Sequence, residues 1–244
     1  MLFYIIGIAL SIPLIVHVIK TGRNTVWVFV LLAFPLIGSA VYFFVEIFPD
    51  LKSSRTSQRA MRGIRSTLDP EANLRKLENE VKVTGNVQSR HRYADELVRL
   101  GRAKEAVSIY QSCLTGVFAD DPKLLLGYAN ALFAAGDASG TRRTLDELIA
   151  KNPEFKSADG HLLYARSVES EGDFEKALTE YSALVEYYPG AEAPVRYAKL
   201  LKRQGQVEQA RQVLGALLER AKYAPSHYKK AQREWLDEAA AELH

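Results

Sequence analysis

The sequence predicts an all-α protein in which a two-span membrane hairpin is followed by a solenoid of four helical hairpins. The membrane hairpin is predicted by two long apolar runs within residues 1–49. The solenoid is predicted by a motif, Tyr-Ala followed by six residues and a Gly, whose four copies begin at Tyr93, Tyr128, Tyr164 and Tyr197. These tyrosines are 35, 36 and 33 residues apart, and repetition at such a period is typical of stacked helical repeats.

The apolar runs cover residues 2–19 and 26–48, and only Glu46 interrupts the second one. Each is long enough to cross the hydrocarbon core of a bilayer, which needs about 20 helical residues. A cleaved signal peptide is the alternative for the first run. That run lacks a basic start and a small-x-small cleavage site, and a second apolar run follows it closely. We therefore expect two spans within residues 1–49.

Four residues of the second run, Trp27, Pro35, Gly38 and Tyr42, have a spacing that resembles the N-terminal membrane segment of cardiolipin synthases and related phospholipase D-type enzymes. The resemblance implies a hairpin that anchors a cytoplasmic domain. Pro35 is expected to kink the span, and Gly38 to allow close helix contact. The alternative interpretation is that the four residues reflect only the generic composition of an apolar helix.

Residues 50–68 are predicted to form a basic juxtamembrane linker. The linker contains no acidic residue between 51 and 68, and its five basic residues are Lys52, Arg55, Arg59, Arg62 and Arg65. Because positive charge is retained on the cytoplasmic side, we expect a cytoplasmic repeat domain, with the bacterial inner membrane as its location. The same five residues would attract anionic lipid headgroups. Lys20 and Arg23, between the two runs, argue mildly for the opposite orientation.

Residues 69–244 are predicted to form the repeat domain, with one helix before the four hairpins and one after them. Asp69 is a suitable cap for the first helix, since Pro70 and Glu71 follow it, and this helix is expected to end near residue 83. The last helix starts after Pro225 and is expected to cover the apolar face that a terminal repeat leaves open.

Each turn Gly is followed five residues later by a small residue, at Ala106, Thr141, Ala177 and Ala210. Apolar residues recur nine, twelve and thirteen positions after the Gly, which traces one helical stripe. The small residues let two antiparallel helices approach closely. Ala191 lies outside this stripe and is expected to tolerate a larger side chain.

This pattern resembles the tetratricopeptide repeat family over residues 87–222. The resemblance implies that the first helices of the hairpins line a concave groove that binds a partner protein. The groove positions it implies are biased towards positive charge in the later units, although Glu169 and Glu192 temper this bias. We predict a site for an acidic segment of the partner, formed by Asn130, Phe133, Arg166, Lys199, Lys202 and Arg203. The alternative is that these are ordinary solvated side chains.

The sequence offers little for catalysis or for cofactor and metal binding. Cys113 is the only cysteine, the five histidines are scattered, and no Gly-rich phosphate loop is present. The phospholipase D motif has one imperfect match, His227-x-Lys229 with Glu234 in place of Asp and no second copy. The repeat domain is net acidic, which argues against nucleic-acid binding. We therefore predict no catalytic, cofactor-binding or metal-binding residue and no enzymatic activity.

The function predicted from the sequence is a non-catalytic, membrane-anchored scaffold that binds partner proteins through its cytoplasmic repeat groove. The alternative is an accessory subunit of a lipid- or envelope-synthesising membrane complex, which would interact through its transmembrane hairpin.

Overall fold

The computed structural model describes residues 2–21, 24–47 and 69–243. It divides into two units, Met1–Pro70 and Glu71–His244, and each is considered by itself. The described residues are helical and contain no strand. The linker at 50–68, with its five predicted lipid-contacting residues, lies outside the described residues.

In the part that the structure describes, the N-terminal unit contains three α-helices that pack on one another and a short π-helix that follows them. They are α1 (Leu2–Thr21), α2 (Val26–Ala33), α3 (Pro35–Tyr42) and η1 (Phe43–Ile47). Within the ranges that the structure describes, we find no helix that combines the length and the apolar character required to cross a bilayer. The two membrane spans remain a prediction.

The sequence predicts that Pro35 kinks the second apolar run. The structure instead divides this run into two helices, because the chain folds back at Phe34. Phe34 leaves the helical region (φ −132°, ψ 71°), and Pro35 then starts α3. Proline has no N–H to continue α2 and disfavours helical backbone at the residue before it. Gly38 then lies so close to α2 that a Cβ atom would meet the carbonyl oxygen of Val30 at 2.7 Å.

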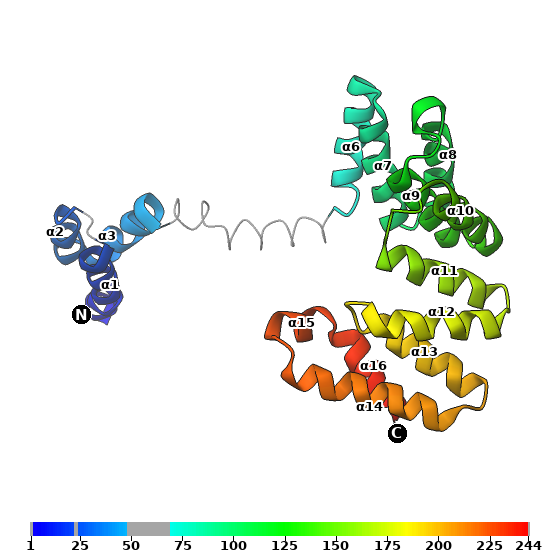
Figure 1. The fold of residues 1–244 in the computed structure, drawn as a ribbon. Coiled ribbons are helices and arrows are strands. Elements are labelled where there is room, and N and C mark those ends of the chain that lie inside the picture. The colour runs from blue at the N-terminus through cyan, green and yellow to red at the C-terminus, as the bar shows by residue number, and fades with distance from the viewer. Residues whose placement is uncertain (1, 22–23, 48–68, 244) are drawn as a thin grey trace. The chain divides into compact units, whose positions relative to one another are not determined.

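The C-terminal unit is an α-solenoid, as predicted (Figure 1). It begins with α6 (Ala72–Thr84) and continues through four helical hairpins, whose first and second helices alternate along the chain. The hairpins are α7 (Val87–Arg99) with α8 (Ala103–Cys113), α9 (Pro122–Ala134) with α10 (Ala138–Lys151), α11 (Ala158–Ser170) with α12 (Phe174–Tyr187), and α13 (Glu192–Arg203) with α14 (Val207–Tyr223). A short 3₁₀ turn, η2 (Gly116–Phe118), precedes α9.

The turn glycines and the small residues act as the repeat pattern predicts. Gly101, Gly136, Gly172 and Gly205 have φ between +77° and +88°, a conformation that glycine adopts without strain. The four small residues five positions later are fully buried at the helix crossings. Thr141 fits where the other units have Ala because its hydroxyl donates to the carbonyl oxygen of Asp137 at 2.7 Å.

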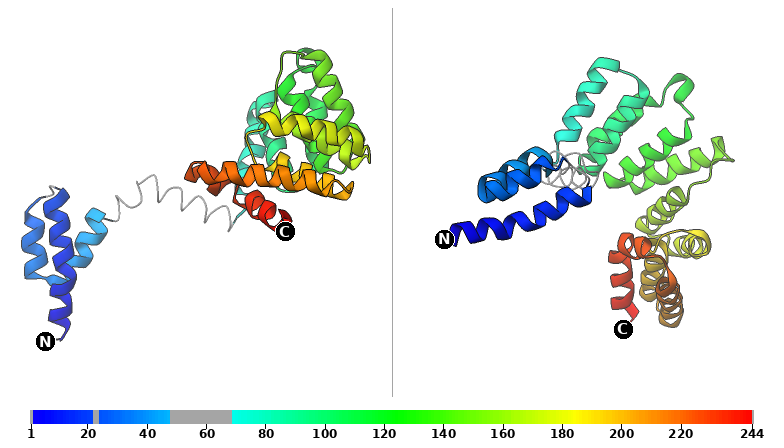
Figure 2. Two further views of the ribbon diagram at one scale, coloured as in Figure 1. Left: turned by 60° about the horizontal axis from the view of Figure 1, so that its bottom comes forward. Right: turned by 90° about the vertical axis from the view of Figure 1, so that its left-hand side faces the viewer.

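The first helix and the cap differ in detail from the prediction. Glu71, not Asp69, is the N-cap residue of α6. The predicted last helix is two helices, α15 (Ser226–Ala231) and α16 (Arg233–Leu243), and α16 packs on α13 and α14 (Figure 2). The chain turns at Gln232, whose side-chain oxygen accepts a hydrogen bond of 2.9 Å from the backbone N–H of Ala191. The expectation for Ala191 is wrong, since this contact and the packing of α13 bury it completely.

Candidate functional site

Among the first helices of the hairpins, α9 contacts α7 and α11, and ion pairs link α11 to α13, on which α16 packs. We call the surface formed by these helices the groove face. Two of the cavities on this face contain residues predicted for the site. The central cavity, of about 460 Å³, includes Asn130 and Arg166, and the terminal cavity, of about 470 Å³, includes Lys199, Lys202 and Arg203. The six residues predicted for the site therefore lie on one face but are divided between two cavities, with Phe133 beside the first.

Arg166 lines the central cavity together with one other cation, Lys123, and three carboxylates: Asp95, Asp159 and Glu192. Its guanidinium carbon lies 4.7 Å above the centre of the Phe133 ring, and Nη1 is 3.7 Å from a carboxylate oxygen of Glu192. Its buried Nε has no hydrogen-bond partner among the described residues. Burial lowers the pKa of this guanidinium, and the nearby Arg196 cation adds to the effect. Arg166 is thus a stacked, half-buried cation with an unused donor.

The rest of the central cavity combines apolar and polar groups. Leu126, Leu162 and Leu163 contribute apolar surface, and Gly127 provides backbone without a side chain. A Cβ atom at Gly127 would collide with the Tyr110 ring. A cavity of this composition can hold an apolar side chain and place a carboxylate near Arg166.

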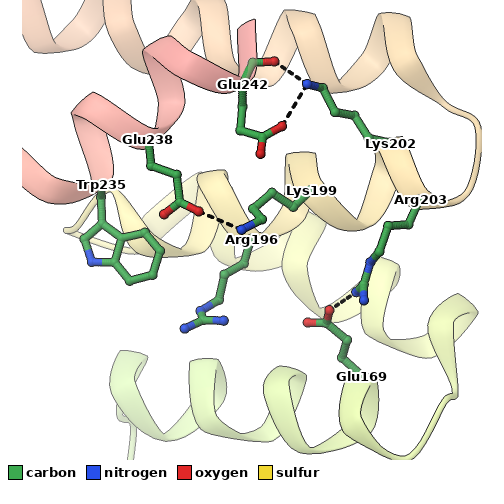
Figure 3. Close-up of a pocket in the computed structure, with 8 residues that line it drawn as sticks. All are labelled: Glu169, Arg196, Lys199, Lys202, Arg203, Trp235, Glu238 and Glu242. Atoms are coloured by element: carbon green, nitrogen blue, oxygen red, sulfur yellow. Dashed lines mark hydrogen bonds and ion pairs between the residues drawn. The ribbon is translucent and has the colours of Figure 1, made fainter.

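The terminal cavity lies between α13 and α16, and its polar groups come from both sides (Figure 3). It is lined by four basic residues, three acidic residues and one tryptophan: Arg196, Lys199, Lys202, Arg203, Glu169, Glu238, Glu242 and Trp235.

The acids of α16 pair with the lysines of α13. The Nζ atom of Lys199 is 2.7 Å from a carboxylate oxygen of Glu238, and that of Lys202 is 2.9 Å from one of Glu242. Lys202 also donates to the backbone carbonyl of Glu242. The hydrogen bond from Lys202 lowers the pKa of the Glu242 carboxyl.

The two arginines of the terminal cavity also have partners. The Arg196 guanidinium carbon lies 5.1 Å from the Trp235 ring centre, and its Nε donates to Glu192 at 2.7 Å. Arg203 pairs with Glu169 of α11. The basic wall predicted to meet an acidic partner is therefore already occupied by acids of the chain itself.

Sequence reasoning identified the cations of the groove face but missed Arg196 and the acids of α16. A signal for the acids was present. Glu238 and Glu242 directly precede Ala239 and Leu243, two apolar residues four positions apart in the last helix. Residues at this spacing share one face of a helix, so the two acids lie at the edge of that face. A cap that covers α14 must bring this edge towards α13.

A further cleft of about 430 Å³ lies between α10, α11 and α12, away from the groove face. His161 is at its wall and is half-buried. Its Nε2 is 2.7 Å from a carboxylate oxygen of Glu180, and its Nδ1 contacts the Tyr187 hydroxyl. His161 therefore links α11 to α12 through polar contacts.

Nothing in the described ranges suggests a metal centre, since no three His, Cys, Asp or Glu side chains there are arranged to hold an ion. The imperfect phospholipase D match is divided between two helices, with His227 and Lys229 on α15 and Glu234 on α16. All three are exposed.

A sequence model of the tetratricopeptide repeat family matches residues 97–167 and 169–234. No curated protein matches the chain. Among solved structures, residues 41 to the end of MamA from Desulfovibrio magneticus RS-1 are 15% identical, with a TM-score of 0.55 over 68% of this chain and 95% of that one. A thermophilic tetratricopeptide repeat protein from Thermus thermophilus is 16% identical, with a TM-score of 0.57 over 76% and 96%. At these identities the likeness concerns the fold alone.

Proposed function

The chain belongs to the tetratricopeptide repeat family, and on this premise we propose that it is a non-catalytic scaffold, tethered to a membrane by residues 1–49, that captures a partner protein on its groove face. Repeat solenoids of this kind present extended surfaces on which a segment of another protein can lie. The observation that carries the proposal is the central cavity, where the Arg166 guanidinium is stacked on Phe133 and the side chain is still 31% exposed.

The partner segment that fits the central cavity carries an acidic group next to an apolar side chain. The acidic group would face Arg166, and the apolar side chain would contact Leu162 and Leu163. A guanidinium stacked on an aromatic ring is held in one orientation, so it loses little freedom when it binds a carboxylate. The groove residues Asn130 and Phe133 would border the same segment.

The surface of the N-terminal unit supports the membrane tether. Large apolar side chains point outwards, including Phe29 and Ile37, which are 72% and 69% exposed. Polar contacts lie between the helices instead. The Tyr42 hydroxyl is 3.0 Å from Nδ1 of His17, and the Trp27 indole N–H donates to Glu46 at 3.0 Å. An apolar exterior around hydrogen-bonded polar groups suits a lipid environment better than water.

The remaining parts of the proposal concern orientation and lipid contact, and they rest on sequence. The five basic residues of the linker would face the cytoplasmic leaflet of the bacterial inner membrane and contact its anionic lipids. The repeat domain would then be cytoplasmic, where its single Cys113 is kept reduced.

Capture from native membranes tests the groove proposal. Tagged full-length chain, solubilised with its partners, would be compared with the Arg166→Gln variant, and the bound proteins would be quantified by mass spectrometry. We expect Arg166→Gln to release the specific partner, because a hydrogen bond to a charged group contributes about 1.5–3 kcal/mol. The matched control is Arg143→Gln, an exposed arginine on the second-helix surface of α10.

Equal capture by the two variants would contradict a groove site. If residues 1–70 alone retained the same partner, the interaction would belong to the N-terminal unit, and an accessory membrane subunit would be the better description. Circular dichroism of both variants would establish that the helices are intact.

A further inference from the structure

A helix that only covered the end of the solenoid would not need to leave a cavity beside α13. The acidic side of α16 does not close against α13, because a cavity of about 470 Å³ remains between the two helices and is bridged by ion pairs. From this arrangement we propose that the terminal cavity is a docking position for an acidic helical segment of the partner, and that Glu238 and Glu242 occupy it as an internal substitute. This inference rests on the proposed groove function and specifies its ligand.

The correspondence between the two helices defines the ligand chemistry. On α13, cations recur at Arg196, Lys199 and Lys202, which is one per helical turn on the same side. On α16, each meets one partner, in the order Trp235, Glu238 and Glu242 (Figure 3). A helix with an aromatic residue followed by Glu three and seven positions later therefore complements this wall.

Helix α16 makes apolar contacts with α14 and ion pairs with α13. Only the ion pairs must be replaced when a partner segment binds. Ala239 is fully buried, and Leu236 and Leu243 pack in the same cluster as Leu214 of α14. Those apolar contacts hold the helix on the solenoid. The side chains of Glu238 and Glu242 are each 32% exposed, and ion pairs at such positions are weak and readily exchanged. Incoming carboxylates can therefore take the lysines while α16 remains docked on α14.

The internal acids make binding of an acidic partner weaker than the basic wall alone would allow. Groups joined by a short connection act at effective concentrations in the millimolar range. A partner segment at a lower concentration must compete with Glu238 and Glu242 for Lys199 and Lys202. Neutralising the two glutamates should therefore strengthen binding, although it also removes two native contacts.

The test is whether neutralising Glu238 and Glu242 strengthens or weakens the binding of an acidic helix. The probe is a fluorescently labelled synthetic peptide with the sequence of residues 233–244, titrated into full-length chain in detergent and followed by anisotropy. We expect Glu238→Gln/Glu242→Gln to bind the peptide between about 2-fold and 30-fold more tightly than the wild type, as two weak ion pairs allow. The gain should fade in about 1 M salt, where the Debye length is about 3 Å.

Two control variants separate the cavity from general charge effects. Glu234→Gln/Asp237→Asn removes the same charge from exposed positions of α16 outside the terminal cavity, and binding should not change. Adding Lys199→Gln/Lys202→Gln to the tight-binding variant should remove the gain. A variant lacking Glu238 and Glu242 that binds no better than wild type, or does not bind, overturns the proposal.

The peptide titration and the capture experiment with Arg166→Gln can fail independently of each other. If the peptide result is negative while Arg166→Gln still releases the membrane partner, the groove binds its partner at the central cavity only. If the peptide result is positive and Arg166→Gln releases nothing, the terminal cavity recognises acidic helices, but the captured partner binds elsewhere.

Discussion

At the scale of single residues, the four small side chains at the helix crossings determine how closely each hairpin packs. Ala177 has no exposed surface and belongs to the same core cluster as Ala165 and Tyr181. Thr141 is the only one of the four that is not alanine, but it is buried in the same way, because its hydroxyl has backbone acceptors at 2.7 and 3.3 Å. The repeat spacing predicted these positions because helix geometry fixes which residues lie on one side.

We expect Ala177→Leu to lower the free energy of unfolding by about 1–3 kcal/mol, because the added atoms overpack a filled crossing. Ala183→Leu is the matched control, since Ala183 lies on the same helix and is exposed. It should change stability by less than about 0.5 kcal/mol. Urea unfolding followed by circular dichroism measures both, and equal midpoints for the two variants would refute the packing assigned to Ala177.

At the scale of elements, the sequence predicted the hairpins well and the deviations from regular helices poorly. The hairpins follow from local periodicity. Pro35 indicated a disturbance of the second apolar run, but the fold-back depends on the approach of Gly38 to α2. Likewise, the turn at Gln232 depends on a hydrogen bond to Ala191, 41 residues away in the chain. Local sequence patterns do not contain such contacts.

The same limit applies to the candidate site. Lys199 and Lys202 could be predicted because they occupy fixed offsets on a first helix. Their partners, Glu238 and Glu242, lie 39 and 40 residues further along the chain. Pairing at that distance depends on how α16 docks, which the repeat pattern does not specify.

The docking of α16 should depend on pH through Glu242. Its folded-state pKa is below the ordinary glutamate value, chiefly because of the hydrogen bond from Lys202. The stabilisation is therefore present above the unfolded pKa of about 4.3 and is lost as pH falls through the folded value. The difference in free energy of unfolding between wild type and Glu242→Gln should thus be largest near pH 7 and shrink below about pH 4.

Chemical denaturation of both proteins from pH 7 to pH 3 measures this difference. Glu234→Gln, at an exposed position of the same helix and outside the contacts with α13, is the control. A Glu242→Gln difference that stays constant down to pH 3 would show that the Lys202 contact contributes nothing to stability.

At the scale of the whole molecule, the chain joins an apolar N-terminal helical unit to a repeat solenoid with a groove face. The cation of the central cavity is loosely paired, with Glu192 at 3.7 Å, whereas the two lysines of the terminal cavity are closely paired, at 2.7 and 2.9 Å. This contrast favours a partner that contacts Arg166 first and then competes for the lysines beside α16. The central claim is that the partner lies on this face.

Site-specific photo-crosslinking in native membranes tests that claim most directly. A photoreactive residue would replace Asn130, which is exposed in the central cavity, and in separate chains Arg143 on α10 or Ile37 in the N-terminal unit. We predict a crosslinked partner from position 130 and none from position 143. A crosslink from position 37 or 143 with none from position 130 would contradict the claim.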